Sequence, residues 1–172
     1  MSIVAISGSW RTVNGQVARD VTSDVLYSLD HGDKIVTGGA LGVDYIATDT
    51  ALRYRGDITG RLQVILPTSY ATYRDHFLSR ARQGVISHKQ ALELMVQLET
   101  VKALGEGALI EMDGLACMPS TYYKRNAAVV DAADELFAYH VNGSQGVQDA
   151  IDRATAAGKP VRLHSYKIAA LG

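Results

Sequence analysis

The chain has 172 residues, of which 47% are hydrophobic and 20% charged, and its formal net charge is -1. These values predict one folded domain over residues 1–172 and argue against disorder, and the nearly neutral charge argues against the strong basic footprint of a non-specific DNA binder. The one cysteine, Cys117, excludes an internal disulfide, and no histidine or cysteine spacing indicates a metal site.

The first part of the chain alternates short apolar strands with helices. Residues 2–7 and 34–37 are rich in β-branched side chains and run into glycines, which indicates buried parallel strands that end in turns. Residues 16–29 and 44–53 carry apolar positions at helical spacing and predict the helices that follow. A third strand over residues 62–66 should stop before proline 67, because proline has no N–H for a strand ladder.

Residues 69–104 interrupt this order with two helical stretches, 74–82 and 87–104, and we interpret the region as a helical excursion from the sheet. The second stretch carries a broad apolar stripe, which either covers the chain's own sheet or contacts a second subunit. Residues 108–112 are either a short strand or an apolar return segment. The stripe consists of Ala91, Leu94, Met95, Leu98 and Val101.

The alternation resumes towards the end of the chain. Helices are predicted over residues 121–133 and 144–157, and strands over residues 135–139 and 160–164. Gly158 stands where a helix C-cap glycine would. Repeated strand, turn and helix units predict parallel strands joined by right-handed crossovers. The expected fold class is therefore α/β, a Rossmann-like three-layer sandwich with a mostly parallel sheet.

Three glycine-bearing segments each follow a predicted strand and precede a predicted helix. The carboxyl ends of parallel strands meet at one sheet edge, where helix N-termini offer free N–H groups to an anion and glycine permits close approach. We therefore expect a phosphate cradle there, and three ordinary tight turns are the alternative. No segment is a strict phosphate-loop or dinucleotide fingerprint, which disfavours ATP hydrolysis and nicotinamide chemistry. The segments span residues 7–11, 37–44 and 142–146.

Several polar and aromatic side chains near these segments are candidates for ligand contacts. Arg11 and Arg125 are suited to hold phosphate oxygens through the planar fork of the guanidinium, and a surface ion pair is the alternative for each. Asp44 either bonds a ribose hydroxyl or stabilises the dipole of its helix. Asn126 either contacts the ligand or ties neighbouring loops together. Trp10 either stacks on a base or packs locally.

The order of these segments resembles that of a known superfamily. The strand followed by GSWR, then TGGALGVDYIATDTAL, KRNAAVVDAADELFAY and GSQGVQDAIDRATAAGKPV, is similar to the SLOG superfamily. That superfamily joins the DNA-processing protein A (Smf) family to the lonely-guy family, once labelled lysine decarboxylases. The resemblance covers most of the chain apart from residues 87–119 and implies a Rossmann-like domain that binds nucleotides or nucleotide-derived ligands. The candidate ligand-binding residues are Gly8, Ser9, Arg11, Gly38, Gly39, Ala40, Gly42, Asp44, Arg125, Asn126, Gly143, Ser144, Gln145 and Gly146.

One departure from the family pattern concerns catalysis. Lonely-guy enzymes cleave the N-glycosidic bond of nucleoside monophosphates with a P-G-G-x-G-T-x-x-E segment and an upstream arginine, which Arg125 resembles. Aligning the glycines puts Ala150 at the glutamate position, and the adjacent Asp149 is rotated by about 100° around the helix. We therefore expect a binding protein whose catalytic glutamate is lost. A phosphoribohydrolase that uses Arg125 with Asp149 is the alternative.

A further alternative is a DNA-processing protein that binds single-stranded DNA. Residues 73–87 loosely resemble a segment of that family, and residues 122–125 combine two tyrosines with two basic side chains. The net charge does not support DNA, so the expected partner is a small-molecule nucleotide, with no metal or other cofactor. Because members of the superfamily are commonly dimers or tetramers, we expect a homo-oligomer. No signal peptide or membrane span is evident, so we expect the cytoplasm.

Overall fold

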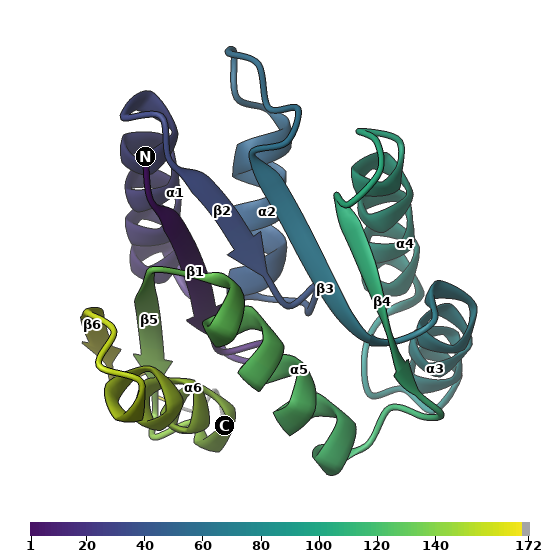
Figure 1. Ribbon diagram of the computed structural model, residues 1–172. Helices are drawn as coiled ribbons and strands as arrows, with labels where there is room; N and C mark the ends of the chain where they lie inside the picture. Colours follow the sequence, from purple (N-terminus) through teal and green to yellow (C-terminus); the bar gives the residue numbers. More distant parts are fainter. Residues whose placement is uncertain (170–172) are drawn as a thin grey trace.

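The computed structural model describes residues 1–169 (Figure 1). None of the helices in this part of the chain is long and apolar enough to cross a membrane. In chain order the elements are β1 (Ile3–Gly8), α1 (Gly15–Asp30), β2 (Lys34–Thr37), α2 (Val43–Leu52), β3 (Leu62–Thr68), α3 (Tyr70–Arg82), α4 (His88–Lys102), β4 (Leu109–Gly114), α5 (Pro119–Ala132), β5 (Glu135–Val141), α6 (Gln145–Ala156) and β6 (Val161–Tyr166).

The six strands form one sheet in the order β4-β3-β2-β1-β5-β6, and every neighbouring pair is parallel. The chain starts in the middle of the sheet, runs outward through β2, β3 and β4, and returns through α5 to β5 on the other side of β1. The strand order therefore reverses between β1 and β5, which is where open parallel sheets bind ligands. The predicted Rossmann-like α/β fold is confirmed.

Alternate side chains of β1 face two different layers of helices. Val4 and Ile6 belong to a core shared with α1, α2, α3 and α4, whereas Ala5 between them belongs to a core shared with α5 and α6. Successive residues of a strand point to opposite faces of the sheet, which produces this division. Figure 1 shows α5 and α6 in front of the sheet and α1, α2 and α4 behind it. The molecule therefore has three layers.

The predicted helical excursion is the long crossover between two neighbouring strands. Helices α3 and α4 connect β3 to β4, which pair in parallel, and the segment predicted as either a strand or a return forms β4. All five apolar side chains of the α4 stripe are buried in the chain's own core. The stripe therefore covers the chain's own sheet, and its interpretation as a subunit contact was wrong.

The end of β3 differs from the sequence prediction. The strand passes through Pro67 and ends at Thr68, so the expectation that it stops before the proline was wrong. Its pairing with β4 shifts register between Leu66 and Thr68. Such an irregularity is one of the few places in a sheet that accommodate a residue without an N–H donor.

Capping residues set two helix ends. Helix α3 begins at Tyr70, earlier than the predicted residue 74, because the Ser69 side chain accepts a hydrogen bond from the Thr72 N–H. At the end of α6, Gly158 has a φ of 69° and its N–H donates to the Thr155 carbonyl at 3.0 Å. The predicted C-cap glycine is thus confirmed.

Candidate ligand-binding site

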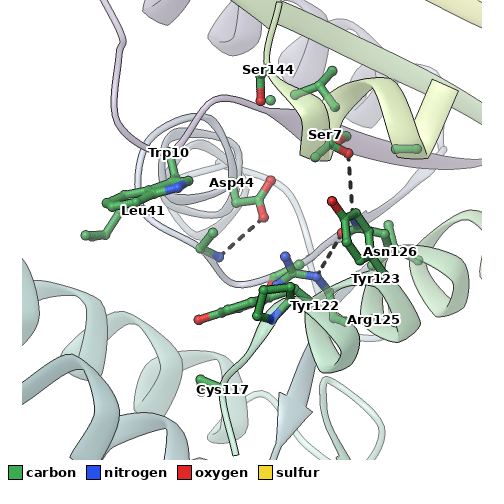
Figure 2. A pocket seen from close by; sticks show the side chains of 18 of the residues that line it. Ser7, Trp10, Leu41, Asp44, Cys117, Tyr122, Tyr123, Arg125, Asn126 and Ser144 are labelled. Atoms are coloured by element: carbon green, nitrogen blue, oxygen red, sulfur yellow. Dashed lines mark hydrogen bonds between the residues drawn. The ribbon is translucent and has the colours of Figure 1, made fainter. Parts of the chain in front are cut away.

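A cavity of about 620 Å³ opens at the carboxyl edge of the sheet, beside the point where the strand order reverses. Its volume falls in the range of about 300–1,000 Å³ that is typical of small-molecule sites. The ends of β1 and β2, the helix α3, the start of α5 and the turn into α6 supply its walls. Figure 2 shows side chains from several of these elements converging on one space.

The cavity brings together nine of the predicted ligand residues, which line its wall. They are Gly8, Gly38, Ala40, Asp44, Arg125, Asn126, Ser144, Gln145 and Gly146. The other five, Ser9, Arg11, Gly39, Gly42 and Gly143, are not part of the lining. Ser9 uses its Oγ to accept a hydrogen bond from the Thr12 N–H at 3.1 Å. Arg11 is exposed, and its guanidinium carbon lies 4.5 Å from the centre of the Trp10 ring.

Packing within the chain explains the glycines of the first two segments. A Cβ on Gly8 would overlap the Val43 side chain of α2, so this glycine lets the helix approach β1. Gly42 has a φ of 72°, and a Cβ there would overlap the Ser9 carbonyl and lie 2.7 Å from the Cα of Trp10. These glycines permit contact between the first and second segments, which needs no ligand to account for it.

Arg125 is the buried positive charge of the site, with 8% of its surface exposed. Its Nη1 donates to the Gly38 carbonyl, and its Nε donates to Asn126 Oδ1 at 3.3 Å. The guanidinium carbon lies 5.4 Å from the centre of the Tyr122 ring. A Cβ on Gly38 would lie 2.8 Å from the guanidinium, so the glycine makes room for this side chain.

Asp44 is the buried negative charge of the site, with 6% of its surface exposed. Its Oδ2 accepts a hydrogen bond from the Ala40 N–H at 3.3 Å. Burial raises the pKa of the Asp44 carboxyl, and this rise is opposed by the charge of Arg125 and by the amides of Ala40 and Gly38. Figure 2 shows the Asp44 and Arg125 side chains facing the same space. Within residues 1–169 the two side chains form no salt bridge with each other.

The N-termini of α2 and α6, both at the cavity, differ in what their amides contact. At α2, the Asp44 carboxylate takes the Ala40 N–H, and the Ser9 carbonyl accepts from the Val43 N–H at 3.0 Å. At α6, within residues 1–169, the capping residue Ser144 makes no side-chain cap hydrogen bond, and the first turn holds no acidic residue. The start of α6 therefore presents uncapped amides and a positive dipole end at the cavity.

The turn before α6 is held by the C-terminal end of the described chain. Asn142 has a φ of 51°, in the left-handed region. Its side-chain Nδ2 donates to the Ile168 carbonyl at 2.8 Å, its Oδ1 accepts from the Ile168 N–H at 2.9 Å, and its own N–H donates to the Tyr166 carbonyl at 3.0 Å. Sequence reasoning included Asn142 in the third segment but missed this role, because Ile168 lies beyond the last predicted strand.

The two positions connected with catalysis lie in different surroundings. Ala150 is 2% exposed and lines the cavity. Asp149 is not part of the lining, and its Oδ2 accepts from the Arg153 Nε at 2.8 Å and from the Asn126 Nδ2 at 3.3 Å. The Asp149 carboxylate is therefore engaged by Arg153 and Asn126 and is not part of the cavity lining.

Sequence reasoning missed the apolar half of the cavity. Tyr73 is fully buried, and its hydroxyl donates to the Gly39 carbonyl at 2.9 Å. The ring of Phe77, one helical turn later, lies 4.8 Å from the Tyr73 ring. This spacing of aromatic residues is the signal that could have identified α3 as a wall. The lining that the sequence did not predict includes Tyr73, His76, Phe77, Arg80, Val85, Ile86, Cys117, Met118 and Pro119.

Burial also affects the ionisable groups at the start of α5. It raises the pKa of the Cys117 thiol and that of the Tyr122 hydroxyl, so both groups are protonated at neutral pH. Across residues 1–169, no three histidine, cysteine or carboxylate side chains lie together as a metal site requires. Arg125, Asp44 and Asn126 are among the polar side chains that line the cavity.

No protein-family model and no curated protein matches the sequence. Among solved structures, the chain is similar to DNA processing protein A from Helicobacter pylori, with a TM-score of 0.66 and 20% identity over 92% of this chain and 63% of the other. It is similar to DNA processing protein A (DprA) from Streptococcus pneumoniae, with a TM-score of 0.62 and 19% identity over 98% of this chain and 51% of the other.

A third similar structure is TM1055, a structural genomics target, with a TM-score of 0.54 and 19% identity over 94% of this chain and 72% of the other. The chain thus spans less than two thirds of each DNA processing protein, at 63% and 51%. At these identities the comparisons show the fold alone. That fold is consistent with the DprA-like fold of the SLOG resemblance.

Proposed function

We propose that this chain binds a nucleotide or a nucleotide-derived ligand in the cavity at the carboxyl edge of the sheet. The observation that carries the proposal is the meeting, in one cavity, of an uncapped helix N-terminus, two buried charged side chains and an aromatic wall. A phosphate, a ribose and a base require these three kinds of contact.

The first turn of α6 is the place we assign to the phosphate. Its amides are uncapped, and Gly146 lines the cavity with an ordinary φ and open space where a Cβ would stand. A helical glycine costs about 0.5–1 kcal/mol relative to alanine, and close approach of a ligand accounts for it. At the second segment the Asp44 carboxylate already lies on the amides, so that segment suits a hydroxyl better than a phosphate.

The apolar half of the cavity is the place we assign to the base. Trp10, Phe77 and Tyr122 line it, and their rings offer faces and edges for stacking. Trp10 is 40% exposed, so its ring stands at the mouth of the cavity. A ligand that spans from α6 to this wall would use both halves of the cavity.

Calorimetric titration with AMP, ADP-ribose and cyclic nucleotides tests the proposal. We expect saturable binding of at least one of them, with about 2.7 kcal/mol of added stability when the ligand is present at one hundred times its Kd. Arg125→Lys keeps the charge but loses the planar fork, and we expect it to weaken binding about tenfold or more. Arg11→Lys is the matched control, because Arg11 lies outside the lining. Absence of binding by all these ligands would overturn the proposal.

Single-stranded DNA binding is a second candidate, which the description of the Helicobacter pylori protein supports. Arg80 and Tyr123 line the cavity and offer a charge and a ring to a strand. Fluorescence anisotropy with a labelled oligonucleotide tests this candidate. DNA binding predicts an affinity that falls steeply with salt concentration, and no binding at low salt would remove the candidate.

The phosphoribohydrolase alternative has weaker support from the geometry. Ala150, which the resemblance aligns with the catalytic glutamate, lines the cavity, and Asp149 is bonded to Arg153 and is not part of the lining. We expect no release of free base when the chain is incubated with AMP, measured by chromatography. Release of adenine at a rate above that of a protein-free sample would favour the enzyme instead.

A further inference from the structure

Asp44 and Arg125 are two buried charges of opposite sign that do not neutralise each other directly. They are 6% and 8% exposed, both line the cavity, and within residues 1–169 no salt bridge joins them. Taking a charge out of water costs several kcal/mol unless a partner compensates it. Groups of the chain compensate these two charges only in part, because their hydrogen-bond partners are backbone groups and one neutral amide. The Tyr122 ring beside Arg125 adds a cation–π contact, and the two charges attract each other without a direct bond.

Each of the two side chains keeps bonding capacity for a ligand. Within residues 1–169, Arg125 makes hydrogen bonds through Nη1 and Nε but none through Nη2. A carboxylate has about four acceptor positions, and the neighbouring amides use only some of those on Asp44. A group that donates to Asp44 and accepts from Arg125 at the same time would compensate both charges.

We propose that Asp44 and Arg125 together bind a vicinal diol, so that the ligand is a ribonucleotide with free 2′ and 3′ hydroxyls. This inference rests on the proposed function and names its ligand class. A hydroxyl both donates and accepts, so a diol can bond the carboxylate with one O–H and receive the guanidinium N–H on the other oxygen. A phosphate group has only acceptors at neutral pH and would meet the Asp44 charge in a poorly solvated site.

The phosphate lies at the start of α6 and the diol lies between Asp44 and Arg125, and this placement makes Asp44 a specificity-determining residue. The uncapped turn of α6 accepts the 5′ phosphate, and the Asp44 carboxylate on the second segment excludes a second phosphate from the sugar end. A 2′-deoxyribose would leave one of the charged groups without its hydroxyl. A nucleic-acid strand, which carries a phosphodiester at the 3′ position, would place an anion beside Asp44. The site therefore favours a free ribonucleotide over a deoxynucleotide or an internal nucleotide of a strand.

Calorimetric titration of three adenine ligands tests this assignment on the unaltered protein. We expect AMP to bind about tenfold or more tightly than 2′-deoxy-AMP, and adenosine 3′,5′-bisphosphate to bind more weakly than AMP. Equal affinity for AMP and 2′-deoxy-AMP would overturn the diol assignment. If none of the three ligands binds but ADP-ribose or a cyclic nucleotide does, the diol assignment is also overturned. Failure of all of these ligands to bind would overturn the proposed function instead.

The variant Asp44→Asn tests which residue sets the preference. It removes the negative charge with little change of shape, so we expect the affinity for the 3′,5′-bisphosphate to rise relative to that for AMP. Asp49→Asn is the matched control, because Asp49 lies on the same helix and pairs with Arg53 on the outer surface at 3.0 Å. If the ratio of the affinity for the bisphosphate to the affinity for AMP is the same in Asp44→Asn and in the unaltered protein, the role of Asp44 is overturned. The ligand series above needs no variant, so the diol assignment is testable even if Asp44→Asn fails to fold.

Discussion

Replacing Gly146 with alanine separates a ligand-binding glycine from a packing glycine. Gly146 lies in the first turn of α6, its φ is not positive, and an added Cβ would meet no atom within 4 Å. Alanine is therefore accommodated without strain, and it restricts the unfolded chain more than glycine does. We expect the free energy of unfolding to rise by about 0.5–1 kcal/mol and the Tm by about 1–4 °C.

The same methyl group should weaken ligand binding. Gly146 lines the cavity, so the new Cβ would enter the space from which a phosphate approaches the α6 amides. Loss of that close approach should raise the Kd for AMP about tenfold or more, which corresponds to about 1.4 kcal/mol. Calorimetry and thermal denaturation on the same samples would show a protein that is more stable and binds less.

Gly158→Ala is the matched control at the other end of α6. Gly158 has a φ of 69°, so alanine there should cost about 1–2 kcal/mol of stability and leave AMP binding unchanged. If Gly146→Ala binds AMP as tightly as the unaltered protein does, the phosphate is not held by this turn, and the assignment of α6 is refuted.

Substitutions at three further positions test the packing and the charges around the cavity. Gly42→Ala should lower stability by about 2 kcal/mol or more, because its φ is 72° and its Cβ would overlap the Ser9 carbonyl, and an unchanged Tm would contradict this. Burial raises the pKa of Asp44 above 3.8, so the folded chain holds the Asp44 proton more tightly than the unfolded chain does. The stability that this difference contributes is fully present below pH 3.8 and is lost as pH rises through the folded pKa. Asp44→Asn should therefore gain stability over the unaltered protein as pH rises from about 4 to about 7 in urea unfolding, and a pH-independent difference would refute this. Asn142→Ala removes both side-chain hydrogen bonds to Ile168 and leaves alanine at a positive φ, so it should lower the free energy of unfolding by about 2 kcal/mol. Asn142→Gly removes the same bonds without the backbone strain and should cost less in the same assay. Equal losses of stability in the two variants would contradict the contribution of strain.

Local patterns in the sequence were sufficient to predict the alternation of strands and helices. The β-branched runs before Gly8 and Gly38 and the helical spacing in α1 need no distant partner to be recognised. The end of β3 depends on a distant partner, because Pro67 is tolerated where the register with β4 shifts. The same holds for the α4 stripe, since only the packed structure shows which apolar surface covers it.

Only part of the candidate site was predicted from the sequence, and its glycines show why. A sequence shows that a position is glycine but not whether a ligand or the chain itself approaches it. Gly42 lies against Ser9, and Gly38 lies against the guanidinium of Arg125, whereas Gly146 borders open space. The wall formed by α3 went unnoticed because its residues are far along the chain from all three segments.

The crystal structure of the chain with AMP bound is the measurement that tests the account most directly. We expect the 5′ phosphate on the first amides of α6 near Gly146, with the ribose hydroxyls between Asp44 and Arg125 and the base against the aromatic wall. Density for AMP on another surface, or a phosphate on the second segment at Ala40, would contradict it.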